Sequence, residues 1–357
     1  MAFEVDVLPV GSGTKSGDAI CLRYGNYQQG FSIHVIDGGY TETGPEIVNH
    51  LNLNYGNPTR IEHVVLTHPD TDHVSGLFEV LENFTVGTLW MHRPWLHADA
   101  IIGRFHGNWT LDGLTRHLRE QFSTLVELEQ LALQGGAVVR SPFQGSNIGE
   151  FTVLAPGMDR YFDILVALPN TPAEVKAKKD SFLTETAKVL ERMRMAVMNY
   201  ITETWYGETL SENPSPTSPS NEASVVQGAI IDGTKILLTG DVGPQGLAEA
   251  FNYASQFGFR QPDFVQVPHH GSRRNVTPST LDNWLGPAVN RGEIRGVAVC
   301  SAATNDLDHP KAKVENAFLR RGYPVHTTKG QLKYYSVGIT RNYDSSLPAP
   351  FRDQVEE

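Results

Sequence analysis

The chain has 357 residues, of which 40% are hydrophobic and 19% are charged, so it can form one large domain or two ordinary ones. Its formal net charge of -11 argues against a broad, nonspecific nucleic-acid-binding surface, because such a surface needs an excess of basic residues. The acidic charge does not exclude a nuclease in which metal ions contact the phosphate directly.

The sequence also bears on the cellular compartment. Its two cysteines, Cys21 and Cys300, lie in apolar segments, which predicts reduced core residues and no disulfide. No apolar run approaches the ~18 residues of a membrane span, and the N-terminal residues lack a signal-peptide pattern. We therefore expect a cytoplasmic protein that has no membrane partner.

The first part of the chain predicts three strands. Residues 3–10 alternate apolar and acidic side chains, which is typical of a half-buried strand. Residues 18–22 and 31–36 predict two further strands, and the second ends in Asp37-Gly38-Gly39, where glycine permits a tight turn. Asp37 is either a turn residue or a carboxylate that orients a ligand histidine.

A group of residues that commonly bind metals follows the next predicted strand. The sequence Thr67-His68-Pro69-Asp70-Thr71-Asp72-His73 comes after an apolar run at 64–66 and before one at 77–81, which predicts a strand, a loop and a helix. Because side chains alternate along an extended chain, His68, Asp70 and Asp72 can point the same way. Imidazole and carboxylate together suit a divalent cation. The alternative is a polar loop with two surface histidines.

This loop resembles the signature His-x-His-x-Asp-His of the metallo-β-lactamase superfamily, with Asp70 in the place of the second histidine. The variant His-x-Asp-x-Asp-His, followed by glycine, is similar to the hydrolase domain of the ComEC competence proteins. The resemblance covers about residues 3–155 and 221–335 and includes the Asp-Gly-Gly turn at 37–39. It implies an α/β fold of the metallo-β-lactamase type, a four-layer αββα sandwich, with residues 1–357 as a single domain.

Residues 157–222 have no counterpart in this resemblance, and we interpret them as a helical and Pro/Ser-rich insertion. Apolar residues recur with a helical period over 173–205, and residues 214–219 form a low-complexity segment. The helix either packs on the parent domain, covers the active site, or contacts a second copy of the chain or another protein partner.

The remaining elements alternate between strands and helices. Upstream of the insertion we expect a strand at 86–91, a long helical stretch over 111–133, and strands at 136–140 and 150–154. Downstream we expect a hairpin of 224–231 with 235–238, a helix at 246–257, strands at 264–267 and 296–301, a helix at 311–321, and a closing strand pair of 325–328 with 331–335.

The resemblance also implies a centre of two divalent metal ions. The implied ligands of one ion are His68 and Asp70, with Asn221 near or on it, and those of the other are Asp72, His73 and either His269 or His270, with Asp241 as the bridge. In one of the two sites, the oxygen ligands Asp70 and Asn221 replace two imidazoles of the superfamily pattern. Oxygen ligands prefer harder cations, which favours Mn²⁺, with Zn²⁺ or Mg²⁺ as alternatives.

We expect a metal-dependent phosphodiesterase or nuclease that acts on nucleic acid or on a small nucleotide. Two cations would lower the pKa of a bridging water so that the resulting hydroxide attacks phosphorus, with Asp72 or Asp241 as proton acceptor. His309 lies in a His-Pro pair like that of the ComEC-type domain and would protonate the leaving group or bind phosphate; the alternative is a histidine that only begins a helix. Further candidates for phosphate contacts are Ser272, Arg273 and Lys329.

Two other functions fit parts of the sequence. The same centre could hydrolyse a carbonyl compound such as a lactone, a thioester or a β-lactam. Alternatively, the chain could be a non-catalytic protein that binds a partner through the helix at 173–205. The nearly complete set of ligands argues against the non-catalytic alternative.

Overall fold

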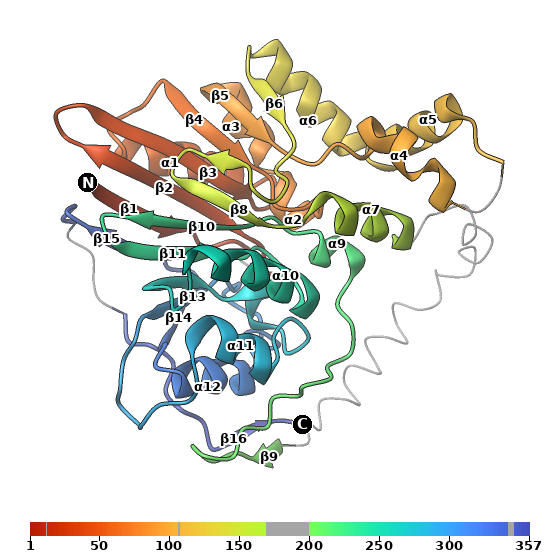
Figure 1. Cartoon of the computed structure of the whole chain (residues 1–357). Helices are drawn as coiled ribbons and strands as arrows, with labels where there is room; N and C mark the ends of the chain where they lie inside the picture. The colour runs from red at the N-terminus through yellow and green to blue at the C-terminus, as the bar shows by residue number, and fades with distance from the viewer. Residues whose placement is uncertain (12, 106–107, 169–199, 342–345) are drawn as a thin grey trace.

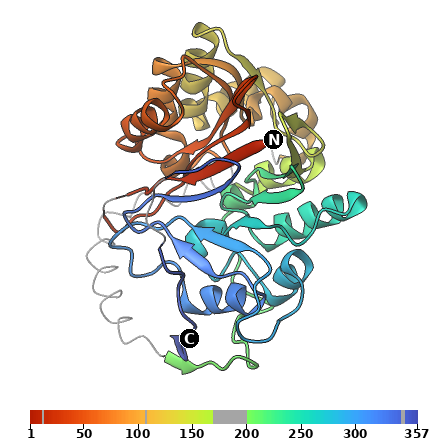
Figure 2. The same ribbon diagram turned by 90° about the vertical axis from the view of Figure 1, so that its left-hand side faces the viewer.

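The computed structural model describes residues 1–357 except 12, 106–107, 169–199 and 342–345. Two seven-stranded sheets face each other, and helices cover the outer side of each sheet (Figure 1). The view turned by 90° shows the N-terminal half of the chain above and most of the C-terminal half below (Figure 2). This is the four-layer αββα sandwich that the sequence predicts.

The first sheet has the order β15-β1-β2-β3-β4-β5-β6. Its strands are β1 (Ala2–Val7), β2 (Ala19–Asn26), β3 (Gly30–Gly38), β4 (Arg60–Val65), β5 (Thr85–Trp90), β6 (Val138–Arg140) and β15 (Lys333–Val337). β3 to β6 run parallel to one another, whereas β15, β1, β2 and β3 are antiparallel neighbours.

The second sheet has the order β14-β13-β12-β11-β10-β8-β7. Its strands are β7 (Asn147–Ile148), β8 (Phe151–Ala155), β10 (Val226–Ile231), β11 (Thr234–Leu238), β12 (Phe264–Gln266), β13 (Val297–Cys300) and β14 (Val325–Thr327). β11 to β14 are parallel, so each sheet has a parallel half whose carboxyl ends can carry functional residues.

Helices pack on the outer face of each sheet around separate apolar cores. The helices of the N-terminal half are α1 (Thr43–Asn54), α2 (Thr71–Val74), α3 (Leu77–Asn83), α4 (Ala98–Ile101), α5 (Leu111–Gln121), α6 (Ser123–Gln134) and α7 (Met158–Ala167). Those of the C-terminal half are α9 (Pro219–Glu222), α10 (Pro244–Ala254), α11 (Pro278–Leu285) and α12 (Ala312–Arg320), and short 3₁₀ turns include η5 (Pro268–Gly271). A third core, which includes Phe3 and Phe264, fills the space between the sheets.

Several local predictions are confirmed. β10 and β11 form the expected hairpin, and its turn residues Asp232 and Gly233 have φ angles of 52° and 82°, as a type I′ turn requires. Cys21 and Cys300 are buried and unpaired. Within the described ranges, no helix combines the length and apolar character needed to cross a membrane.

The long helical stretch predicted over 111–133 is confirmed, but the structure divides it into two helices. α5 ends and α6 begins at Phe122, whose φ of -109° and ψ of 41° interrupt the α-helical backbone. Both helices bury apolar residues in the same core, for example Leu118 and Leu125, so the hydrophobic pattern continues across the break.

The predicted closing strand pair is also wrong. β14 lies at the edge of the second sheet and β15 at the edge of the first, so the short connection between them crosses from one sheet to the other. The sequence predicts a strand for each segment, which the structure confirms. A short turn such as 328–331 does not by itself determine whether the two strands that it connects pair with each other.

The insertion is described only in part. The helix predicted over 173–205 falls mostly on residues 169–199, which lie outside the described part of the chain. Its predicted end is wrong, since Tyr200–Thr202 forms strand β9, which pairs with β16 (Gln354–Glu356). Residues 214–218 are irregular and lead into α9, whose first turn is capped by the hydroxyl of Ser218.

β1 is buried on both faces, whereas the sequence predicts a half-buried strand. The side chains of Glu4 and Asp6 are fully buried. Arg341 lies 2.6 Å from Glu4 and 3.0 Å from Asp6, Arg23 lies 2.5 Å from Glu4, and His50 lies 2.8 Å from Asp6. Burial and the neighbouring Asp6 raise the pKa of Glu4, and the two arginines oppose this rise.

We predict that Arg341→Met lowers the free energy of unfolding at pH 7 by roughly 3 kcal/mol, because it leaves two buried carboxylates without their shared cation. The loss should shrink on acidification, since protonated carboxyls no longer need a cation. Urea denaturation at pH 7 and pH 5 measures both effects. Arg116→Met, at an exposed position of α5, is the control and should change stability by less than about 0.5 kcal/mol. Equal midpoints for the two variants would contradict the prediction.

Candidate metal centre

Polar side chains from both sheets meet where the parallel strands end. β3 ends beside Asp37, and β4 leads into the loop of His68 and His73. In the second sheet, β11 is followed by Asp241 and β12 by His270. Because the carboxyl ends of these strands lie at the same end of the sandwich, residues more than 200 positions apart come together.

Asp241 lies at the middle of this group. Its Oδ2 lies 3.9 Å from His68 Nε2, 3.4 Å from His73 Nε2 and 3.7 Å from His270 Nε2. Asp72 Oδ2 lies 3.8 Å from His73 Nε2 and 3.7 Å from His270 Nε2. Most of these separations are too long for hydrogen bonds but leave room for a cation between the atoms.

The ligand atoms are buried and have no hydrogen-bond partner. This holds for the Nε2 atoms of His68, His73 and His270 and for Oδ1 of Asp241. Buried polar atoms in proteins are nearly always paired, so four unpaired ligand atoms in one place require an explanation. Among the described residues, His68, His73 and Asp241 form one group that could hold a metal ion, and Asp72, His73 and His270 form another. The residues present therefore fit divalent cations.

Hydrogen bonds of the Nδ1 atoms fix the orientation of the imidazole rings of His73 and His270. Asp37 accepts from His73 Nδ1 at 2.8 Å, from the Thr67 main-chain N–H at 2.8 Å and from the Thr67 hydroxyl at 2.6 Å. His270 Nδ1 lies 3.2 Å from the main-chain oxygen of Ser301. When Nδ1 donates to such an acceptor, Nε2 is free to bind a metal. The structure thus gives Asp37 the orienting role rather than that of a simple turn residue.

Asp18 is a further member of the group that the sequence analysis did not select. It is buried and could share a metal ion with Asp241 and His270. Gln266 donates to its Oδ2 at 2.9 Å. Burial, which the nearby histidines only partly offset, raises the pKa of Asp18 to about 6. The only signal in the sequence was a Gly-Asp pair before a strand, which is also typical of an ordinary turn.

The structure gives the two adjacent histidines different surroundings. His269 and His270 have φ angles of 45° and 55°, which is a strained backbone for non-glycine residues. His270 is buried and belongs to two of the possible ligand groups, whereas the side chain of His269 is 30% exposed. His269 Nδ1 lies 2.9 Å from Asn275 Oδ1, and His269 Nε2 lies 3.6 Å from Asp241 Oδ2.

Asp70 and Asn221 lie at the margin of the group. Asp70 Oδ2 lies 3.6 Å from His68 Nε2, and Ser220 donates to Asp70 Oδ1 at 2.6 Å. Burial alone would raise the pKa of Asp70, but these two neighbours outweigh it and lower the pKa to about 2. The amide nitrogen of Asn221 lies 3.0 Å from the ring of His269, so Asn221 borders that histidine.

The remaining predicted site residues lie on two sides of His269. The ring of His309 lies nearly parallel to that of His269 at 6.3 Å, and its Nδ1 lies 3.2 Å from Asp306. The ammonium group of Lys329 donates to the main-chain oxygen of Asp306 at 3.1 Å. Ser272 is buried, and Arg273 is exposed and donates to the main-chain oxygen of Glu357.

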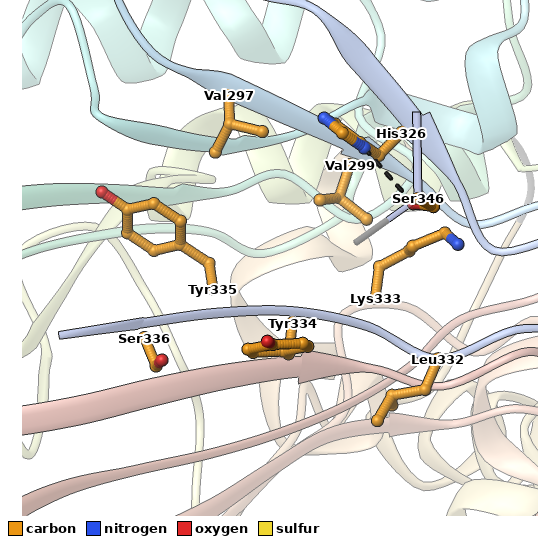
Figure 3. A pocket seen from close by; sticks show the side chains of 9 residues that line it. All are labelled: Val297, Val299, His326, Leu332, Lys333, Tyr334, Tyr335, Ser336 and Ser346. Carbon is orange, nitrogen blue, oxygen red and sulfur yellow. Dashed lines mark hydrogen bonds between the residues drawn. The ribbon is translucent and has the colours of Figure 1, made fainter. Parts of the chain in front are cut away.

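A cavity of about 400 Å³ between the edges of the two sheets is separate from this centre (Figure 3). It is lined by residues of β13, β14 and β15, among them Val299, His326 and Tyr335. His326 Nδ1 lies 3.5 Å from the hydroxyl of Ser346. None of the candidate metal ligands lines it, so its size does not make it the reaction site.

We predict that Asp37→Asn weakens binding of a divalent metal about 10- to 100-fold, because an amide cannot accept from His73 and Thr67 as a carboxylate does. Isothermal titration calorimetry with Mn²⁺ and with Zn²⁺ measures the affinity, and circular dichroism checks the fold. Asp232→Asn, in the exposed hairpin turn, is the matched control and should bind as the unmodified protein does. Unchanged affinity in Asp37→Asn would argue against its orienting role.

We also predict that metal binding at pH 7 releases roughly one to two protons. Burial opposes protonation of His270, but Asp241, Asp72 and Asp18 raise its pKa to about 9, so the metal-free protein carries this proton at pH 7. The release should fall as pH rises past about 9, because His270 is then already neutral. Calorimetry in buffers of different ionisation enthalpy measures it, and a binding heat that is independent of the buffer would contradict the prediction.

Comparisons with known proteins agree with this geometry. The sequence model of the metallo-beta-lactamase superfamily matches residues 31–120, which include Asp37 and the loop of His68 to His73. Among curated proteins, no similar sequence is found.

Similar solved structures have low sequence identity. One is Tm1679, a metal-dependent hydrolase of the beta-lactamase superfamily (10% identity, TM-score 0.44, covering 95% of this chain and 100% of that one). Another is Zn²⁺-bound PqqB from Methylobacterium extorquens (10% identity, TM-score 0.42, covering 94% and 100%). A third is a long form of RNase Z from yeast (9% identity, TM-score 0.40, covering 93% and 41%). At these values the structures do not indicate which substrate this chain uses.

The match over 31–120 contains the loop of His68 to His73, and the two sheets place that loop opposite Asp241 and His270. Residues 31–120 thus resemble the metallo-beta-lactamase superfamily in sequence, and the two facing sheets with their outer helices have the metallo-beta-lactamase fold.

Proposed function

We propose that this metal-dependent hydrolase is a phosphodiesterase or nuclease that uses two divalent ions. The observation that carries the proposal is the excess of carboxylates at the centre, where Asp18, Asp37, Asp72 and Asp241 face three histidines. Such a set is too acidic to stay buried without strong positive compensation. Phosphodiesters are anionic, and hydrolysis adds further charge at phosphorus, so a cation-rich centre suits them.

The grouping of the side chains supports two ions. Asp241 shares one possible metal group with His68 and His73 and another with Asp18 and His270. A carboxylate that belongs to both groups can bridge two ions. The large share of carboxylate ligands favours Mn²⁺ over Zn²⁺. Asp70, in the place of a histidine of the superfamily signature, adds to this preference and is the feature shared with ComEC-type domains.

When bound, divalent ions would polarise the phosphoryl group and lower the pKa of a water molecule toward neutrality. The chain supplies the proton transfers around them. Asp72, whose side chain is 25% exposed, lies at the rim of the centre and takes the proton of the attacking water. His309 is held through Nδ1 by Asp306, so its Nε2 is the atom that gives a proton to the leaving oxygen.

We predict that the metal-stripped protein regains hydrolysis of bis-p-nitrophenyl phosphate with Mn²⁺, and that Asp72→Ala lowers the rate at least about 100-fold, because it loses both a ligand and the proton acceptor. Release of nitrophenolate measures the rate. Asp112→Ala, at an exposed position of α5, is the matched control and should retain full activity.

Three results would count against parts of this proposal. Full activity of Asp72→Ala would contradict the assigned site. Activity that zinc restores and manganese does not would contradict the metal preference. If no metal supports release while a lactone or thioester is hydrolysed, the phosphodiesterase function itself is wrong.

A further inference from the structure

A second pocket, of about 320 Å³, lies next to the loop that carries His269 and His270. Three basic side chains line it, those of Arg273, Arg274 and Lys313. Ser215, from the irregular segment before α9, lines another side, and Glu357 lines a third. A cluster of three cations is unusual in a chain whose formal net charge is -11.

Among the described residues, two of these cations form no ion pair. Lys313 is only 6% exposed, and no ion pair or hydrogen bond of its ammonium group is found within the described ranges. The guanidinium of Arg274, which is exposed, likewise forms no ion pair there. Arg273 donates to the main-chain oxygen of Glu357.

The burial of Lys313 is unfavourable as it stands. A lysine is almost never buried unless it is paired, because its charge loses the solvation of water. Desolvation and the nearby Arg273 lower the pKa of Lys313, whereas Glu356, Glu203 and Glu357 oppose this fall without reversing it. An anion in the pocket would add to the compensation that these carboxylates supply only in part.

The pocket adjoins the metal centre through a short polar connection. The hydroxyl of Thr217 lies 3.3 Å from the amide nitrogens of both Asn221 and Asn275. Both amides contact the ring of His269, at 3.0 Å and 2.9 Å. Ser215 is two residues from Thr217, so their Cα atoms are at most about 7 Å apart. A ligand with two charged groups can therefore reach both places.

Resting on the function proposed above, we propose that this basic pocket binds a second phosphate group of the substrate, adjacent to the phosphodiester that is cleaved. The substrate would then be an oligonucleotide rather than an isolated diester. The planar guanidinium groups of Arg273 and Arg274 match the geometry of phosphate oxygens, and Lys313 adds a compact charge to the lining of the pocket. Its volume leaves space for the sugar that carries the phosphate.

A binding experiment tests this without requiring turnover. Metal-free protein is titrated with the dinucleotide thymidylyl-thymidine, either unmodified or with an added terminal phosphate at its 5′ or its 3′ end. We expect one phosphorylated form to bind about 10-fold more tightly than the unmodified form, since the extra phosphate makes charge-assisted hydrogen bonds. Inorganic phosphate alone, as a competitor, should weaken the binding of that form.

Variants identify the residues responsible. Lys313→Met should abolish the preference for the phosphorylated dinucleotide, and its melting temperature should equal or exceed that of the unmodified protein, because a buried unpaired charge is removed. Arg274→Gln, at an exposed position, tests the same pocket if Lys313→Met does not fold. Lys235→Met is the matched control: this lysine donates to the main-chain oxygen of Arg260, lies outside the pocket, and should retain the preference.

The outcomes separate this inference from the proposed function. Equal binding of all three dinucleotides, or a preference that persists in both Lys313→Met and Arg274→Gln, would overturn the second phosphate site. A preference that depends on Lys313 supports it even if bis-p-nitrophenyl phosphate is not hydrolysed, and that second result would count against the catalytic function alone.

Discussion

The requirement to hold several carboxylates and imidazoles close together, away from water, governs the structure of this protein. Asp241 is 2% exposed and faces His68, His73 and His270, which come from two different sheets. In the metal-free chain, His270, His73 and His269 lower the pKa of Asp241 well below the ordinary value, although burial opposes ionisation. Metal ions would replace the protons of His73 and His270 and leave the same atoms in place.

The backbone around the centre is built for close approach. A Cβ atom at Gly76, just after the ligand loop, would lie 2.0 Å from the main-chain oxygen of Gly38. Any larger residue at Gly76 would therefore push the loop of His73 away from the turn that carries Asp37. The hydrogen bond between His73 and Asp37 depends on this close contact of the main chains. Gly76 therefore helps to orient the candidate metal ligand His73 without contacting the metal site itself.

Charge is distributed unevenly in the molecule. The acidic centre suits cations, and the neighbouring pocket of Arg273, Arg274 and Lys313 suits anions. In a substrate with several phosphate groups, one phosphate would bind the metal ions and the adjacent phosphate would bind the basic side chains. The overall negative charge would repel such a substrate elsewhere on the surface, which would favour binding at this basic pocket.

The sequence by itself determined the local features of this protein. The His and Asp spacing of residues 68–73, the strands before them and the hairpin at Asp232-Gly233 were predictable, because period and turn chemistry act over a few residues. The four-layer fold was expected from the resemblance of that spacing to the metallo-β-lactamase signature. Tertiary structure alone decided which distant groups meet. It placed Asp18 beside His270, gave His269 and His270 different surroundings, moved β14 and β15 into different sheets, and brought Lys313 into one pocket with Arg273 and Arg274. Sequence spacing fixes the direction of a side chain within one element, whereas the distance between elements depends on how the two sheets pack.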